Sequence, residues 1–208
     1  MSNNYLPDCV SVSFIPGNFF DKSINEPFIK KIISHVLKQD DWIPGDPNKK
    51  EPDYFCNGVP FEFTIASDSK RKNNFIQRYK SGSYKTNDIE TDVIDYIGFR
   101  INEKSKKNYS VPGVHLCVLC LLELTAWVSD EYGSDFYEVT NEYRKRFFKI
   151  IKRYYINNKI FNNVFIIFPD MSAKWWVYDV LTGNRDYYQL SEQEIKNREL
   201  PFVLIKSV

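Results

Sequence analysis

The sequence is poor in histidine, with His35 and His115 as its only two among 208 residues. One falls in a predicted helix and the other in a predicted buried strand, and these positions explain both as structural residues. We therefore exclude a histidine-dependent catalytic triad and a histidine-rich zinc site. The chain also lacks the glycine-rich motifs that bind phosphates or dinucleotides.

Cysteine is scarce as well. Four cysteines are too few and too scattered for a disulfide scaffold: Cys9, Cys56, Cys117 and Cys120. The last two have CxxC spacing, but they lie in an apolar run, and residues three apart on a strand point to opposite faces. No second CxxC is present, so the spacing does not indicate a zinc site. Reduced cysteines in a cytosolic protein explain this pattern better than disulfides or a zinc site do.

Long apolar stretches and an excess of charge are also missing. The longest apolar run, 114–128, contains His115 and Glu123 and is too short to span a bilayer. The residues after Met1 have neither the basic nor the apolar region of a signal peptide. A formal net charge of +1 does not by itself indicate a nucleic-acid partner. We therefore expect a soluble, cytoplasmic protein with no membrane partner.

Apolar and aromatic residues are plentiful, at 43% and 16% of the chain, which is typical of a folded protein with a substantial core. The length and the absence of internal repeats predict a single domain, residues 1–208. Helical spacing of apolar residues predicts helices at about 23–39, 88–107 and 136–156. A capping-box pattern begins the first of these helices at Ser23, and another at Ser191 begins a short last helix.

Strands are expected between these helices, at about residues 41–43, 53–56, 59–66, 114–122, 163–168, 174–180 and 201–205. The strand at 114–122 is almost wholly apolar, which is typical of a strand buried on both faces. The fold class is therefore α/β, with a mixed central β-sheet flanked by helices.

The most informative motif is Asn57-Gly58, which predicts a two-residue hairpin turn because both turn positions need a positive φ. Counting outward from the turn places Asp53 directly opposite Glu62, at a closely spaced pair. Two like charges this close destabilise a sheet. Either the pair is exposed to solvent, or a cation such as Mg²⁺ lies between the carboxylates.

Basic residues gather in two segments. Residues 69–87 contain six lysines and arginines and no acidic residue, and we expect them to form a loop. The helix at 136–156 has a basic side at helical spacing. Either segment is a candidate for contacts with nucleic-acid phosphates, and the alternative for each is an ordinary solvated surface. With the end of the second helix, the candidates are Lys70, Arg71, Lys72, Lys107, Lys149, Lys152 and Arg153.

The order of elements, with Pro52-Asp53 on one hairpin strand and Glu62-Phe63-Thr64 on the next, resembles the PD-(D/E)XK, or restriction endonuclease-like, superfamily. The resemblance covers roughly residues 20–122 and implies an αβββαβ core, to which 123–208 add a helix and strands. It implies that Asp53 and Glu62 bind one or two Mg²⁺ ions, or Mn²⁺. It also implies that Glu26 is a further ligand or support.

Thr64 departs from the superfamily pattern, which usually has a lysine there. In active members that lysine positions or activates the attacking water and offsets developing charge, and threonine cannot supply a cation. Some members carry the lysine on a neighbouring helix. On that basis Lys104, Lys107 or Lys70 is a candidate substitute.

The resemblance implies a Mg²⁺-dependent endonuclease that hydrolyses DNA phosphodiester bonds, with Asp53, Glu62, Thr64 and Lys104 at the catalytic centre. One alternative, which Thr64 favours, is an inactive nuclease-fold protein that acts as a DNA- or protein-binding module. A further alternative is a small α/β interaction protein with an accidental acidic pair. The sequence does not define the oligomeric state, and a homodimer is compatible with each alternative.

Overall fold

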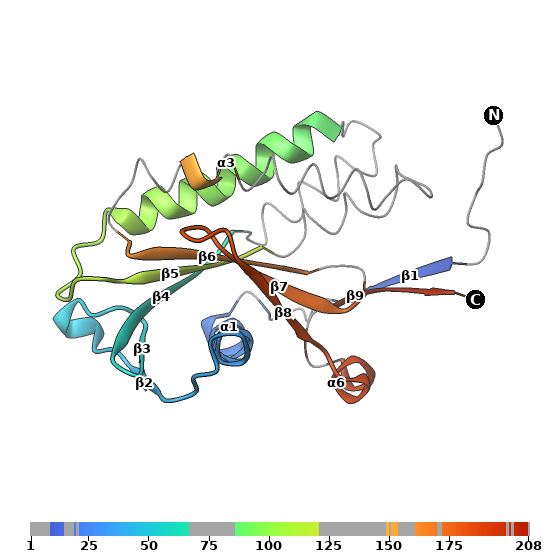
Figure 1. Cartoon of the computed structure of the whole chain (residues 1–208), viewed down its shortest axis with the longest axis horizontal. Coiled ribbons are helices and arrows are strands. Elements are labelled where there is room, and N and C mark those ends of the chain that lie inside the picture. The colour runs from blue at the N-terminus through green and yellow to red at the C-terminus, as the bar shows by residue number, and fades with distance from the viewer. Residues whose placement is uncertain are drawn as a thin grey trace.

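The chain forms a mixed α/β structure around a seven-stranded sheet with the strand order β2-β3-β4-β5-β6-β7-β8 (Figure 1). The computed structural model describes residues 9–14, 19, 21–66, 86–120, 149, 151–153, 161–169, 172–198, 200 and 202–207. The seven strands are β2 (Trp42–Pro44), β3 (Tyr54–Cys56), β4 (Val59–Ile65), β5 (His115–Leu119), β6 (Asn163–Pro169), β7 (Lys174–Asp179) and β8 (Arg185–Gln189).

Parallel pairing is confined to the centre of this sheet. β5 pairs in parallel with β4 and with β6, whereas the outer neighbours all pair antiparallel. Two parallel strands must be joined by a crossover connection. Helix α3 (Thr86–Ser105) lies in the crossover connection between β4 and β5. Four of the five residues of β5 are buried, as expected for a central strand covered on both faces. The predicted mixed, helix-flanked sheet is thus confirmed.

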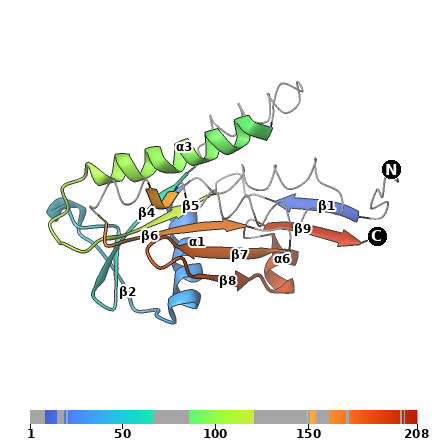
Figure 2. The ribbon, with the colours of Figure 1, turned by 45° about the horizontal axis from the view of Figure 1, so that its top comes forward.

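Helices cover the two faces of the sheet, with α1 (Lys22–Leu37) on one side and α3 on the other (Figures 1 and 2). Phe61 and Phe63 of β4 belong to the core cluster under α1. Because side chains alternate along a strand, Glu62 and Thr64 face the α3 side. In the part of the chain that the structure describes, no helix is long and apolar enough to cross a membrane.

Helix α1 begins earlier than its predicted capping box. Asp21 is the N-cap residue and makes no side-chain cap bond, so Ser23 lies inside the first turn. Instead, the Asn25 amide donates a hydrogen bond to the Asp21 carbonyl at 2.7 Å. Pro27 lies inside the helix, where its missing N–H cannot bond the Ser23 carbonyl. The predicted helix is present, but the predicted capping box is wrong.

The Asn57-Gly58 turn is confirmed, with φ angles of 48° and 79°. β3 and β4 pair in the predicted register, but the ladder ends at Tyr54 with Phe61. Asp53 therefore lies one residue beyond the ladder. The predicted pairing of Asp53 with Glu62 is wrong. The Phe63 N–H, which would continue the ladder, instead donates a hydrogen bond to the side-chain Oδ2 of Asp53 at 2.8 Å.

Two strands appear that the sequence did not predict. β8 forms one edge of the main sheet, and β1 (Cys9–Phe14) pairs antiparallel with β9 (Phe202–Ser207) in a separate two-stranded sheet. The predicted capping box at Ser191 is confirmed at the start of α6 (Glu192–Asn197). Residues 151–153 are helical as predicted. Most of the predicted 136–156 helix and of the basic segment 69–87 lies outside the described residues.

Candidate functional site

Glu62 is a carboxylate with no exposed surface, which is rare unless the charge is paired. Its Oε1 accepts a hydrogen bond from Lys104 Nζ at 2.5 Å and another from Lys107. Its Oε2 is buried and has no hydrogen-bond partner among the described residues. A buried oxygen without a partner is costly, which suggests that a further donor or cation belongs at this position.

The two lysines come from the C-terminal end of α3. Lys104 is in its last turn, and a hydrogen bond from the Lys107 N–H to the Lys104 carbonyl (3.1 Å) continues the turn beyond the helix. Burial lowers the pKa of Lys104, and the attraction of Glu62 offsets this only in part. Burial also acts to lower the pKa of Lys107. The hydrogen bond from Lys107 to Glu62 and the attraction of the Glu62 charge outweigh burial and raise this pKa. Lys104 therefore releases its proton more readily than an ordinary lysine.

Asp53 lies beside Glu62, held by two different partners. Its Oδ2 accepts a hydrogen bond from the backbone N–H of Phe63 at 2.8 Å, and its Oδ1 accepts one from Lys22 at 3.1 Å. The first bond attaches the carboxylate to β4 next to Glu62. The negative charge of Asp53 acts on Lys104 and Lys107, where it favours the protonated forms. Both carboxylates therefore act on the same pair of lysines.

A tight turn before β3 positions Asp53. A Cβ atom at Gly45 would lie 2.0 Å from the Pro52 carbonyl oxygen, so this close approach requires glycine. The carboxylate of Glu51 accepts a hydrogen bond from the Asp46 N–H at 2.8 Å, which closes the same turn. The residues around the Asp53 carbonyl are thus fixed by backbone contacts, which restrict where its side chain can point.

Glu26 contributes from α1, on the other side of Asp53. Lys22 Nζ lies 3.2 Å from Glu26 Oε1 and 3.1 Å from Asp53 Oδ1, and so bridges the two carboxylates. The Tyr54 hydroxyl donates a hydrogen bond to Glu26 Oε2 at 2.9 Å. Burial and this bond raise the pKa of Tyr54 to about 12, so the hydroxyl stays protonated. Glu26 is therefore placed to support Asp53 through Lys22.

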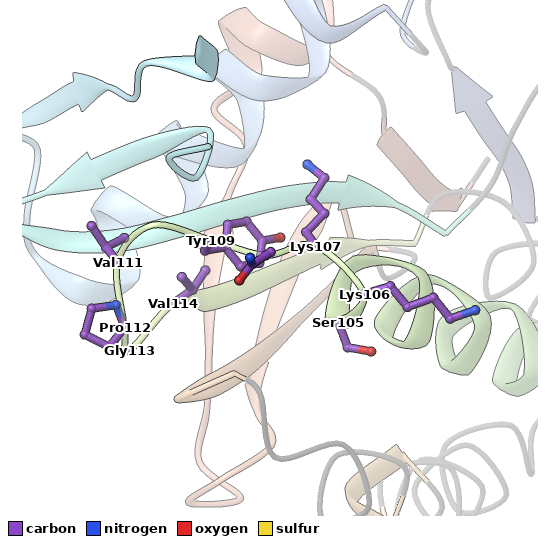
Figure 3. A pocket seen from close by; sticks show the side chains of 9 residues that line it. Ser105, Lys106, Lys107, Tyr109, Val111, Pro112, Gly113 and Val114 are labelled. Atoms are coloured by element: carbon purple, nitrogen blue, oxygen red, sulfur yellow. The ribbon is translucent and has the colours of Figure 1, made fainter. Parts of the chain in front are cut away.

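A pocket of about 380 Å³ adjoins the lysines, between the end of α3 and the start of β5 (Figure 3). Lys107 and Tyr109 line it, and the ammonium nitrogen of Lys107 lies 5.9 Å from the centre of the Tyr109 ring. Lys106 points in a different direction from Lys107 in Figure 3. Burial raises the pKa of Tyr109, and the charges of Glu62 and Asp53 raise it further. Its hydroxyl is therefore a protonated donor close to both carboxylates.

Sequence reasoning did not single out Tyr109, because an aromatic residue two positions after Lys107 has no distinguishing pattern. Thr64 is buried on the same side of β4 as Glu62, where it offers a hydroxyl and no charge. Lys149 and Arg153 are exposed, and Lys152 donates a hydrogen bond to the Leu181 carbonyl at 3.3 Å, at the turn between β7 and β8. The structure does not describe the other predicted phosphate contacts, at Lys70, Arg71 and Lys72.

The two histidines have the surroundings expected of structural residues. His115 packs against the rings of Phe61 and Phe165, at centroid distances of 5.2 and 5.8 Å. Burial lowers the pKa of His115, which favours its neutral form. His35 packs edge-on against the Tyr188 ring, with the ring centroids 5.2 Å apart.

The carboxylates fit a divalent metal in part. Glu62 Oε2 has no hydrogen-bond partner among the described residues. Among the same residues, the only ion pair of Asp53 Oδ1 is with Lys22, whose side chain is exposed. Within the described ranges no three His, Cys, Asp or Glu side chains are arranged as a metal-binding group. Two carboxylates suit Mg²⁺, which keeps several waters and takes further oxygens from a substrate. An all-protein cage does not fit these residues.

Comparison of the chain with protein-family models, with curated proteins and with solved structures finds no match. The resemblance to the PD-(D/E)XK superfamily therefore stays a prediction, based on Asp53, Glu62 and the order of elements. The interpretation of the site depends on the geometry of this chain.

Proposed function

We propose that the protein is a metal-dependent nuclease that hydrolyses DNA phosphodiester bonds at the site formed by Asp53 and Glu62. The observation that carries the proposal is the convergence of Lys104 and Lys107 on Glu62. The resemblance requires a lysine beside the metal-binding acid, and Thr64 cannot supply it. Two lysines from α3 provide the positive charge instead.

The order of the elements supports the same proposal. Among the described residues from Lys22 to Leu119, the elements follow the order α1, β2, β3, β4, α3 and β5, with one short 3₁₀ helix, η1 (Pro47–Lys49), between β2 and β3. This order agrees with the αβββαβ core that the resemblance implies. The two acids come from the start of β3 and from β4, and the lysines come from the next helix, so all four lie within that core.

Each residue has a role that follows from its surroundings. Asp53 and Glu62 would hold Mg²⁺ or Mn²⁺, and such an ion would lower the pKa of a bound water and polarise the phosphate. Lys104, held against Glu62 by an ion pair, would place a positive charge beside the phosphate and offset the negative charge that develops there. Lys107 and Tyr109, both proton donors beside the pocket, bind phosphate oxygens.

One observation favours the alternative, an inactive nuclease-fold protein that binds DNA or protein. Lys22 pairs with Asp53 and Lys104 pairs with Glu62, so both acids are neutralised by protein side chains alone. In such a module the same residues stabilise the fold and the basic groups form the binding surface.

A cleavage assay separates the two functions. Plasmid and single-stranded DNA are incubated with the protein and Mg²⁺ or Mn²⁺, and products are followed over time. We expect cleavage by wild type that Asp53→Ala and Glu62→Ala both abolish. The matched control is Glu103→Gln, which removes a carboxylate paired with Arg100 on α3. DNA binding without cleavage would support the inactive module, and neither binding nor cleavage would contradict both functions.

A further inference from the structure

Lys22 is the exposed member of a charged cluster beside the candidate metal site. Its Nζ lies 3.1 Å from Asp53 Oδ1 and 3.2 Å from Glu26 Oε1. The side chain of Lys22 is 69% exposed, whereas those of Asp53 and Glu26 are only 14% and 12% exposed. One solvated cation therefore pairs with two carboxylates that are mostly buried.

The place of Lys22 in α1 does not by itself account for a lysine there. Lys22 is the first residue of the helix, and a positive charge is unfavourable at a helix N-terminus. A lysine that precedes its glutamate by four residues also has the less favourable orientation of such a pair on a helix. What Lys22 supplies is therefore a positive charge for Asp53 and Glu26, at some cost to its own helix.

The contact between Lys22 and Asp53 involves the oxygen that a metal ion would need. Asp53 Oδ2 already accepts the hydrogen bond from the Phe63 N–H at 2.8 Å, whereas Oδ1 accepts one from Lys22. Mg²⁺ lies about 2.1 Å from its ligand oxygens, so an ion on Oδ1 and the Lys22 ammonium would be within about 5 Å of each other. Two cations at that distance repel each other, so the ion and Lys22 compete for Asp53.

Among the lysines that the structure shows in contact with the two candidate metal-binding acids, Lys22 is the most exposed. The side chains of Lys104 and Lys107 are 13% and 49% exposed, compared with 69% for Lys22. Water can therefore solvate the Lys22 ammonium when it leaves Asp53, and Glu26 remains as its partner. Lys22 is thus the cation that an incoming metal ion displaces most easily.

We propose that Lys22 competes with the divalent metal ion: it occupies Asp53 in the metal-free protein and leaves Asp53 when Mg²⁺ or Mn²⁺ binds. The inference rests on the proposed function, because it assigns a regulatory residue to the same metal site. Lys22 stabilises the metal-free fold by matching the charge of the acids. For the same reason it weakens the affinity of the site for metal.

The test is Mn²⁺ binding without DNA, measured from the electron paramagnetic resonance signal of free Mn²⁺. We expect Lys22→Met to bind Mn²⁺ about fivefold more tightly than wild type, because the ion no longer displaces an ion pair with one exposed partner. Without metal, Lys22→Met should unfold at a lower temperature than wild type, because Asp53 and Glu26 lose their shared cation. The same concentration of Mn²⁺ should then raise the unfolding temperature more in Lys22→Met than in wild type.

Two control variants separate the local charge of Lys22 from general effects. Lys22→Arg keeps a cation that can reach Asp53, so its affinity for Mn²⁺ should stay within about twofold of wild type. Lys196→Met removes one positive charge from an exposed position of α6, and its affinity should also stay within about twofold. A purely structural role of Lys22 would lower the unfolding temperature of Lys22→Met without tightening Mn²⁺ binding.

The outcomes distinguish this proposal from the nuclease proposal. Equal or weaker Mn²⁺ binding by folded Lys22→Met overturns the competition, even if wild type cleaves DNA. Absence of Mn²⁺ binding by both wild type and Lys22→Met overturns it as well. Tighter binding by Lys22→Met supports the competition even if the protein cleaves no DNA, because neither readout depends on cleavage.

Discussion

Glu62 depends on its two lysines, because a buried carboxylate is stable only when its charge is matched. The lysines are not equivalent. The Lys104 side chain is 13% exposed, whereas that of Lys107 is 49% exposed. An ion pair loses most of its strength when one partner is well solvated. Lys104 should therefore contribute more than Lys107 to the stability of the folded protein.

Substitution of the two lysines tests this difference. Lys104→Met should lower the free energy of unfolding by about 2–3 kcal/mol, less than the loss of a sole buried partner, because Lys107 remains. Lys107→Met should lower it by less than about 1 kcal/mol. Urea denaturation followed by circular dichroism measures both changes. Equal losses of unfolding free energy in the two variants would contradict the larger contribution that we expect from Lys104.

The hairpin that carries Glu62 was predictable from sequence. Asn57-Gly58 defined the hairpin register, but the predicted pairing of Asp53 with Glu62 is wrong, because the ladder ends one residue earlier. The contact of both Lys104 and Lys107 with Glu62 was not predictable, because it depends on where the end of α3 lies relative to β4. The hydrogen bond from the Phe63 N–H to Asp53 was also unpredictable, since it follows from the ladder ending one residue early.

At the scale of elements, Glu194 attaches α6 to the rest of the molecule. It caps its own helix through Ser191, contacts Lys31 of α1, and accepts a hydrogen bond from the Tyr188 hydroxyl at 2.9 Å. Burial acts to raise the pKa of Glu194, but the bonds from Lys31, Ser191 and Tyr188 outweigh it and lower the pKa to about 2. One carboxylate therefore joins α6, α1 and β8.

This carboxylate should make stability depend on pH in the acid range. Its pKa is lower in the folded protein than in the unfolded chain, so its contribution is complete above about pH 4.5. The contribution is lost as pH falls toward 2. The stability difference between wild type and Glu194→Gln, measured by urea denaturation from pH 7 to pH 2.5, should shrink over that window.

The control for this prediction is Glu192→Gln, which removes a carboxylate from an exposed position of the same helix. Its pH dependence should follow that of wild type. A difference between Glu194→Gln and wild type that stays constant down to pH 2.5 would show that the carboxylate does not stabilise the fold through its charge.

The two elements that sequence reasoning missed, β1 and β8, are both strands. β8 is almost entirely exposed and polar at an edge of the sheet, so it has no apolar alternation to detect. β1 was likewise missed, and its partner β9 lies at the other end of the chain. By contrast, every position of β6 is buried, and its apolar sequence made it easy to predict.

At the scale of the whole molecule, the sheet separates two core clusters. Ile29 of α1 belongs to one cluster and Ile101 of α3 to the other, and both are fully buried. The central strands β5 and β6 contribute to both clusters. Because these strands are shared, we expect the two clusters to unfold together, as the prediction of a single domain requires.

Ile29→Ala and Ile101→Ala should each lower the free energy of unfolding by about 2–5 kcal/mol. In both variants, tryptophan fluorescence and far-ultraviolet circular dichroism should report the same single transition. Ile43→Ala, at a position that is 57% exposed, is the control and should change stability by less than about 0.5 kcal/mol. Separate transitions for the two probes would contradict a single cooperative domain.

The nuclease proposal makes Lys104 the residue that distinguishes an active site from a structural ion pair. The most direct measurement is the single-turnover rate of DNA cleavage with Mg²⁺ by folded wild type and folded Lys104→Met. The account predicts that wild type cleaves and that Lys104→Met is at least about 100-fold slower, the usual effect of losing a group that stabilises charge in the transition state. Absence of cleavage by wild type, or an unchanged rate in Lys104→Met, would contradict it.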